Sequence, residues 1–198
     1  FQAIAPVERM RTRVHGGVCY SPGVALFPPL DHDPDEVREL LAPLRNDVSI
    51  ALHSHANPFS VGGIIRVAHS FLVREILIVG AEPWYQKASM GMHRYEDIRV
   101  LANDAALLEH VRGRPVWAIE KDHARRSIFD VQEYPRDVVL LFGSERAGLP
   151  KELVEAADDV IGIPMYGVNH SYPVSVTVGM VLLDWARRRY RPGTVVAG

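Results

Sequence analysis

Short apolar segments that alternate with segments of helical periodicity constrain the fold of this chain more than any other feature of its sequence. The clearest apolar segment is VVLLF, at residues 138–142, which contains no polar residue. A strand that is apolar on both sides is buried on both sides, as the strands of parallel sheets are. The intervening helices then cover the two faces of that sheet. The pattern therefore predicts an α/β protein whose mostly parallel sheet is covered by helices.

The predicted elements fill most of the chain. Strands are expected at residues 48–52, 75–79, 115–119, 138–142 and 160–163, and helices at about 34–44, 60–71, 101–111, 149–156 and 174–190. Ser60 is expected to cap the second of these helices, and Ser171 to lie in the capping region of the last one, with Pro173 at its first position. Residues 1–46 are interpreted as an N-terminal extension with one short helix, and residues 47–198 as a domain.

Composition excludes several classes of protein. The 198 residues include 22 basic and 24 acidic ones, so bulk charge cannot hold nucleic acid, although a local basic face remains compatible. Cys19 is the single cysteine, which rules out a disulfide framework and fits a reducing cytosol. The longest apolar stretch, 174–183, is interrupted by polar residues and is far shorter than the roughly 20 residues of a membrane helix. With no recognisable secretory leader, we expect a cytoplasmic location and no membrane association.

Three motifs follow predicted strands, at the edge of a parallel sheet where ligands bind. The first, NPFSVGGIIR at 57–66, places Arg66 early in a helix, where its planar cation suits a phosphate or a carboxylate. The second, LFGSERAGLP at 141–150, has two glycines that allow backbone amides to face a ligand, with Glu145 beside them. The third, IPMYGVNHSYPVSV at 163–176, runs from a strand end into a helix. Taken singly, each motif also suits an ordinary strand-to-helix connection.

Together and in this order, the three motifs resemble those of the SPOUT superfamily of RNA methyltransferases, in particular its SpoU/TrmH-type branch, over about residues 48–190. The resemblance implies a deep trefoil knot at roughly 138–190, whose loops hold S-adenosylmethionine largely through backbone groups. It also implies a homodimer, joined through the knot region and the last helix, that methylates a ribose 2′-hydroxyl of rRNA or tRNA. The expected cofactor-binding residues are Leu141, Gly143, Ile163, Met165, Tyr172 and Val174.

The resemblance assigns catalytic roles to Arg66, Glu145 and Ser171. Arg66 is expected to contact RNA phosphate and ribose, Glu145 to position Arg66 or the ribose, and Ser171 to lie beside the methyl donor. Because the free pKa of an arginine exceeds ~12, orientation and charge stabilisation suit Arg66 better than proton abstraction. Further RNA contacts are expected from a basic segment, or else that segment is a solvated surface. Its candidates are Lys121, Arg125 and Arg126.

Two positions depart from the family pattern. Ser60 and Pro173 stand where the family has asparagines that help to organise the catalytic pocket. Proline offers neither an amide side chain nor a backbone donor. An alternative hypothesis is therefore a catalytically weakened SPOUT relative that binds RNA or cofactor. A third, an unrelated nucleotide-binding enzyme with an open sheet, is disfavoured because the sequence lacks the phosphate-binding fingerprints of such enzymes.

Other conspicuous residues leave alternatives open. His53 and His55 lack partnering cysteines or a nearby carboxylate pattern, so no metal site is predicted. Trp84 and Tyr85 either stack on an RNA base or pack beneath a loop. The apolar residues of the predicted last helix belong either to the core or to a dimer interface. They are Val178, Leu182 and Trp185.

Overall fold

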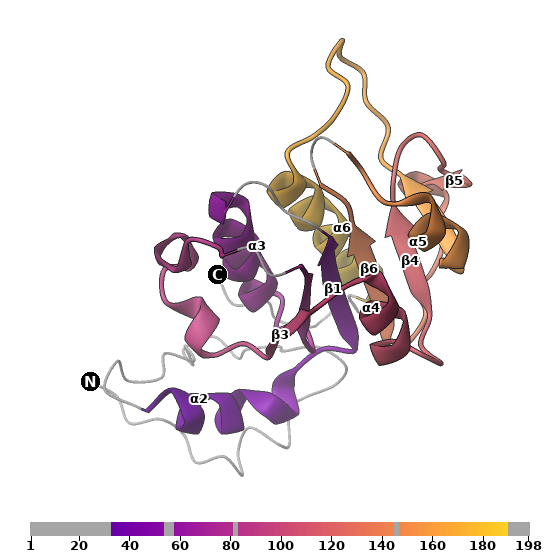
Figure 1. Ribbon diagram of the computed structural model, residues 1–198. Coiled ribbons are helices and arrows are strands. Elements are labelled where there is room, and N and C mark those ends of the chain that lie inside the picture. The colour runs from indigo at the N-terminus through magenta and orange to yellow at the C-terminus, as the bar shows by residue number, and fades with distance from the viewer. Residues whose placement is uncertain (1–32, 54–57, 81–82, 145–146, 190–198) are drawn as a thin grey trace.

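The computed structural model describes residues 33–53, 58–80, 83–144 and 147–189 (Figure 1). Within these residues, seven strands form one sheet in the order β3-β2-β1-β6-β4-β7-β5, and each pair of neighbours is parallel. The strands are β1 (Val48–His53), β2 (Ile76–Val79), β3 (Ile98–Leu101), β4 (Val116–Ile119), β5 (Arg126–Ser127), β6 (Val138–Phe142) and β7 (Asp159–Gly162). The predicted α/β class with a parallel sheet is confirmed.

The helices are α2 (Pro34–Leu41), α3 (Pro58–Ser70), α4 (Asp104–His110), α5 (Lys151–Ala156) and α6 (Val174–Arg189), with short 3-10 turns η1 (Ala42–Leu44), η2 (Gln86–Ser89), η3 (Met92–Arg94) and η4 (Ile128–Asp130). Helices α3, α4 and α5 connect strands, whereas α2 precedes β1 and α6 follows β7. The turn of α2 begins where the carboxylate of Asp33 accepts a hydrogen bond from the Asp35 N–H at 2.8 Å, which caps the helix.

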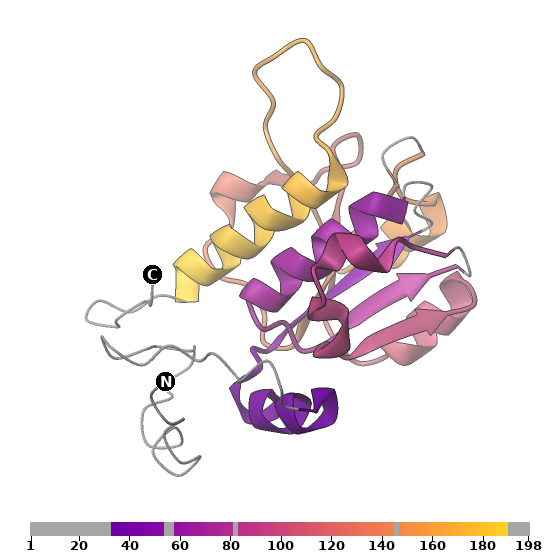
Figure 2. The ribbon, with the colours of Figure 1, turned by 90° about the vertical axis from the view of Figure 1, so that its left-hand side faces the viewer.

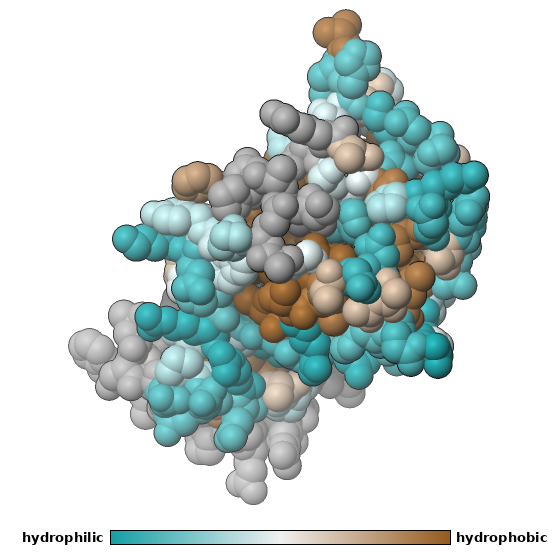
Figure 3. Space-filling view, in the orientation of Figure 1, coloured by the Kyte–Doolittle hydropathy of each residue, from teal (hydrophilic) through white to brown (hydrophobic). Residues whose placement is uncertain are grey.

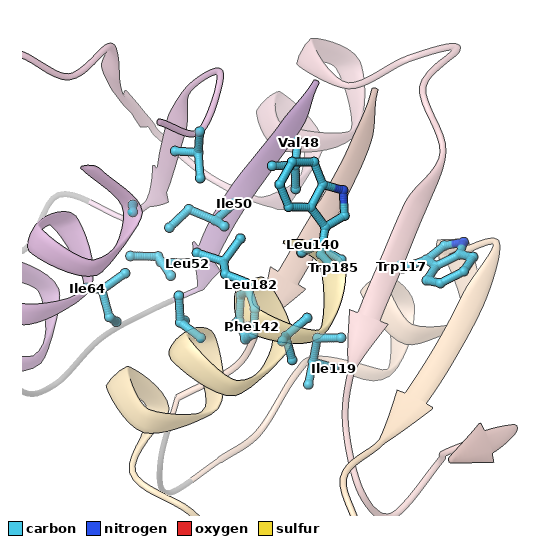
Figure 4. Close-up of a cluster of buried hydrophobic side chains, with 14 of the residues drawn as sticks. Val48, Ile50, Leu52, Ile64, Trp117, Ile119, Leu140, Phe142, Leu182 and Trp185 are labelled. Carbon is cyan, nitrogen blue, oxygen red and sulfur yellow. The ribbon is translucent and has the colours of Figure 1, made fainter. Parts of the chain in front are cut away.

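The two faces of the sheet have separate cores. On one face α3 and α6 lie side by side (Figure 2), and their apolar residues pack with Ile50 and Leu52 of β1. On the other face α4 and α5 pack with Ala51, which lies between Ile50 and Leu52 in β1. Successive residues of a strand point to opposite faces, so an uninterrupted apolar strand serves both cores. Figure 4 shows the first core, in which side chains of β1, β4 and β6 meet those of α3 and α6.

Two predicted elements begin in the wrong place. The helix expected at 101–111 is wrong in its first part, because residues 98–101 form β3. The side chain of Asn103 accepts a hydrogen bond from the Ala106 N–H at 2.9 Å and caps α4, which therefore begins at Asp104. The cap expected at Ser60 is also wrong, since α3 begins at Pro58 and Ser60 lies inside the helix. Neither β3 nor the two-residue β5 is among the predicted strands.

The last helix begins at Val174, as the apolar pattern predicts, and not at Pro173. The carbonyl of Pro173 accepts hydrogen bonds from the N–H groups of Val176 and Thr177, each at 3.0 Å, so Pro173 precedes the first helical residue. Val178, Leu182 and Trp185 are buried within the same chain, which makes them core residues and not an interface. The exposed apolar residues of α6 are Val176, Met180 and Leu183.

A network of charges joins the amino ends of several strands. Glu75, 6% exposed, accepts a hydrogen bond from Arg114 at 2.5 Å and pairs with His110 at 2.9 Å. Arg114 also donates to the Ser49 hydroxyl at 2.6 Å and to the Asp137 carboxylate at 3.0 Å. Burial alone would raise the pKa of Glu75, but the hydrogen bonds from His110 and Arg114 outweigh burial and hold that pKa below its ordinary value. The charged side chains at the amino ends of these strands therefore pair with one another within the chain.

Candidate functional site

A pocket of about 350 Å³ lies at the opposite edge of the sheet, where β4, β6 and β7 end. Residues from three connections line it: those that follow β4 (119–123), β6 (142–149) and β7 (163–177). Parallel strands end at the same edge, so the three connections meet although they are distant in the sequence. Two of the three contain the second and third motifs.

Glycine permits the tight contacts within the connection after β6. A Cβ atom on Gly143 would lie 2.6 Å from the backbone nitrogen of Leu149 and would also collide with the carbonyl group of Gly148. Gly148 itself has a φ of +65°, in the left-handed region that favours glycine. Ser144 and Gly148 exchange two backbone hydrogen bonds, of 3.2 and 3.0 Å, which close the loop. The backbone of this loop therefore forms part of the pocket wall.

Glu120 joins two of the lining connections. Its carboxylate accepts a hydrogen bond from the Lys121 N–H at 2.8 Å and another from the Leu149 N–H at 3.3 Å. The second bond fixes the loop after β6 against the connection after β4. Sequence reasoning missed Glu120. The available signal was a carboxylate placed directly after a buried strand, at the edge where ligands bind.

The connection after β7 projects from the molecule before it returns to α6 (Figures 1 and 2). The Tyr172 hydroxyl donates to the Pro164 carbonyl at 3.1 Å and ties the two ends of this connection together. The side chain of Asn169 donates to the Ser171 carbonyl at 3.2 Å. Tyr166 and Val168 are 89% and 99% exposed, and hydrophobic atoms mark the outer end of the projection in Figure 3.

Most of the predicted cofactor-binding residues line this pocket. They are Gly143, Ile163, Met165, Tyr172 and Val174, and the predicted catalytic residue Ser171 lies with them. Leu141 does not line the pocket, because it is buried in β6 and packs in the core beneath α4 and α5. Glu145 lies outside the described residues.

The predicted RNA-binding residues are dispersed. Lys121 lines the pocket and pairs with Asp122 at 3.3 Å. Arg125 donates to backbone carbonyls and does not line the pocket. Arg126 is similarly occupied, pairing with the Asp159 carboxylate at 2.8 Å.

Arg66 is exposed on α3, and it too lies outside the pocket lining. The carboxylate of Asp104 pairs with His53 at 2.9 Å, whereas His55 lies outside the described residues. In the described part of the chain, no group of three or more His, Cys, Asp or Glu side chains is arranged to hold a metal ion. The same residues contain no helix that is both long and apolar enough to cross a membrane.

Comparison with known proteins identifies the family. The chain is 28% identical over 162 residues to a tRNA (guanosine(18)-2′-O)-methyltransferase of Thermus thermophilus, covering 79% of this chain and 83% of that protein. The solved A. aeolicus TrmH/SpoU tRNA modifying enzyme is 27% identical, with a TM-score of 0.68 over 79% of this chain and 82% of that one. An AdoMet-bound rRNA methyltransferase from Sinorhizobium meliloti is also 27% identical, with a TM-score of 0.66 over 76% and 59% of the two chains. Residues 47–183 match the model of the SpoU rRNA Methylase family, and the chain belongs to that family.

Proposed function

We propose that this protein transfers a methyl group from S-adenosylmethionine to a ribose 2′-hydroxyl of rRNA or tRNA. The observation that carries the proposal is the pocket at the ends of β4, β6 and β7, which gathers two of the family motifs in one place. The names of the relatives support the reaction, since the Thermus thermophilus protein is named as a tRNA 2′-O-methyltransferase. Our further proposals are a cytoplasmic location and a methyltransferase domain at 47–198, preceded by an extension at 1–46.

The pocket suits S-adenosylmethionine in size and chemistry. Its volume of about 350 Å³ falls within the range of small-molecule sites. Apolar side chains such as Phe142 and Leu149 would face the adenine, while the backbone of the Gly143 loop and the Ser171 hydroxyl offer hydrogen bonds. The carboxylate of Glu120 suits a cationic ligand. A single Cβ atom on Gly143 would collide with the backbone of Gly148 and Leu149, so glycine is needed for the loop conformation that lines the pocket.

Within this proposal, the chain's own residues align the RNA. When bound, S-adenosylmethionine supplies an electrophilic methyl group. Arg66 would hold RNA phosphate and ribose with its guanidinium, and its positive charge would stabilise the 2′-oxygen while the hydroxyl proton passes to solvent water. Ser171 is exposed at the pocket and orients the ribose, together with Glu145. Lys121, which lines the pocket, would extend the contact to a neighbouring phosphate, and Arg125 and Arg126 would add positive charge there while they keep their bonds within the chain.

The proposed trefoil knot involves residues 138–190. Its support is the path of the chain: β7 lies beyond β4, yet the following helix α6 returns to pack with β1 and α3. The connection after β6 and the connection after β7 both line one pocket, so the returning chain passes close to the earlier loop.

The proposed homodimer uses the last helix. Val176, Met180 and Leu183 are spaced so that they share one side of α6, and they are 43%, 37% and 63% exposed. A second copy would cover this apolar stripe. Sedimentation of the purified chain tests the dimer, and Leu183→Glu should yield a monomer.

Calorimetric titration with S-adenosylmethionine and with its demethylated product tests the cofactor proposal. Binding would justify a tritiated-methyl transfer assay on tRNA and rRNA, followed by nuclease digestion to locate the methyl group on the ribose. Arg66→Ala should lose methyl transfer while it keeps cofactor affinity. A folded chain that binds neither compound would contradict the proposal.

A chain that binds RNA and cofactor without methyl transfer would instead favour the catalytically weakened relative. In that case a double variant, Ser60→Asn with Pro173→Asn, should raise methyl transfer, because it restores the two family asparagines. The matched control is Ser60→Ala, which removes the hydroxyl without supplying an amide. It should leave the activity at or below that of the original chain.

A further inference from the structure

Two exposed aromatic rings meet at the edge of the sheet where the strands end. Phe59 lies at the start of α3, after β1, and Tyr85 lies in the connection after β2. The two rings are in contact, with centroids 4.8 Å apart and planes tilted by 49°. They are nevertheless 61% and 42% exposed. The proposed reaction centre at β4, β6 and β7 does not include either ring.

The backbone that carries Tyr85 is firmly held. Gly62 of α3 allows close approach, since a Cβ atom there would lie 2.6 Å from the Ala88 Cβ and 2.9 Å from the Tyr85 carbonyl oxygen. Behind the segment, the buried Ser89 hydroxyl donates to the Gln86 carbonyl at 2.7 Å. These contacts fix the Tyr85 backbone before any ligand binds, so little conformational entropy remains to be lost there.

The neighbouring Trp84 also helps to hold this segment in place. It packs against the core on the α3 side and meets the ring of His93 edge-on, with centroids 5.7 Å apart. His93 in turn lies 2.7 Å from the Ser89 hydroxyl through its Nδ1 atom. Burial, together with the charge of Arg94, lowers the pKa of His93, which favours a neutral ring suited to packing. Trp84 therefore packs beneath the surface, whereas Tyr85 is presented on it.

Positive charge accompanies the two rings. Arg66 follows Phe59 by about two helical turns, so both residues lie on the solvent-facing side of α3. Lys87 and Arg94 are exposed on the segments that follow Tyr85. Among the described residues, none of these three cations has a hydrogen-bonding or ion-pair partner for its side chain. Exposed rings flanked by available cations are the combination that binds unpaired nucleotides, through base stacking and phosphate contacts.

We propose that Phe59 and Tyr85 form a stacking platform for an unpaired base of the substrate RNA, with Arg66, Lys87 and Arg94 on the adjoining phosphates. This inference rests on the proposed function and deepens it, because it states that the substrate is presented as single-stranded RNA along this edge of the sheet. The two rings already touch, so the base stacks on an outer ring face and not between them. Protein interfaces also favour aromatic and arginine side chains, so a protein partner is one of the outcomes that the test distinguishes.

The test measures RNA affinity of the full chain by fluorescence anisotropy, with polyuridylate and bulk tRNA as probes. Phe59→Ala and Tyr85→Ala should each weaken binding by at least about 5-fold, as expected for loss of one stacking surface. Phe59→Trp should restore the affinity, whereas Phe59→Leu should not, because leucine keeps the apolar surface and removes the ring face. Phe129→Ala is the matched control, since Phe129 is 65% exposed on η4, which follows the opposite edge strand β5. Calorimetry with S-adenosylmethionine should give the same affinity for every variant.

The outcomes separate the platform from the proposed function. If the original chain binds and methylates RNA and the ring variants bind equally well, the platform is wrong and the function stands. If Phe59→Leu matches the original chain, stacking is excluded. If the ring variants keep RNA affinity but change the sedimentation of the protein, the rings belong to a protein contact. If the original chain binds cofactor but neither RNA probe, both the platform and the RNA substrate are contradicted.

Discussion

The two ends of the same parallel strands carry opposite kinds of polar chemistry. At the amino ends, Glu75 and Arg114 are largely buried and bonded to each other, with further partners within the chain. At the carboxyl ends, the pocket is lined by loop backbone, by glycines and by exposed polar groups such as Ser171. Charges that are satisfied internally support the fold, while polar groups that face a pocket remain available to a ligand. Substitutions at the two ends should accordingly separate stability from binding.

The largest effect on stability is expected from Arg114→Ala. It leaves the Glu75 carboxylate buried without its closest partner, which typically costs about 3–5 kcal/mol. The free energy of unfolding in urea measures this cost. Arg74→Ala is the matched control, because Arg74 also pairs with Asp137 but its side chain is 55% exposed, and it should cost less than about 1 kcal/mol. Equal losses for the two variants would contradict the importance of burial at this edge.

At the opposite end, Gly143→Ala should chiefly affect binding. The new Cβ atom forces the loop at Gly148 and Leu149 to move, so the affinity for S-adenosylmethionine should fall about 100-fold, or roughly 2.7 kcal/mol. Gly63→Ala is the control, because a Cβ atom on Gly63 meets nothing within 4 Å and alanine favours the helix. Calorimetric titration of both variants provides the comparison. Undiminished affinity in Gly143→Ala would remove this loop from the proposed cofactor site.

The sequence predicts the residues at the carboxyl ends of the strands better than those at the amino ends. The motif around Gly143 is a local signal, a buried strand followed by glycines. Five of the six predicted cofactor-binding residues line the pocket and Leu141 does not, while their role in binding stays a prediction. Glu120 was missed because its partner, the Leu149 N–H, lies 29 residues away and becomes adjacent only when β4 and β6 pair. The Glu75 network was missed for the same reason, since Arg114 is 39 residues from Glu75.

Edge strands were the other failure of prediction. Val100 of β3 is 59% exposed and Arg99 is charged, so this strand lacks the continuous apolar run that marks β6. Its hydrogen bonds to β2 define it as a strand, and these depend on tertiary structure. The apolar pattern therefore predicts the central strands of this sheet. It misses the edge strand β3 and begins the following helix, α4, too early.

A smaller effect, at the carboxyl ends, is expected from Glu120→Gln. Glutamine can no longer present two acceptor oxygens to the Lys121 and Leu149 N–H groups, and loss of a hydrogen bond to a charged group costs about 1.5–3 kcal/mol. Part of that cost should appear as an affinity for S-adenosylmethionine reduced about 10-fold. Asp122→Asn makes the same change of charge on an exposed residue of the same pocket. If both variants lose the same affinity for S-adenosylmethionine, Glu120 acts through its negative charge and not by positioning the loop.

The smallest effect is expected from acid, which should lower the free energy of unfolding through the protonation of Glu75 at the amino ends of the strands. The pKa of Glu75 is lower in the folded chain than its ordinary value of 4.5, since its hydrogen bonds from His110 and Arg114 outweigh the effect of burial. The unfolded chain therefore binds the proton more readily, and stability that is present above pH 4.5 is lost as the pH falls through the folded pKa. One such group contributes at most about 1.4 kcal/mol per pH unit. Urea denaturation from pH 6 to pH 3 should show a shallower loss for Glu75→Gln than for the original chain, and parallel slopes would mean that Glu75 does not couple proton binding to folding.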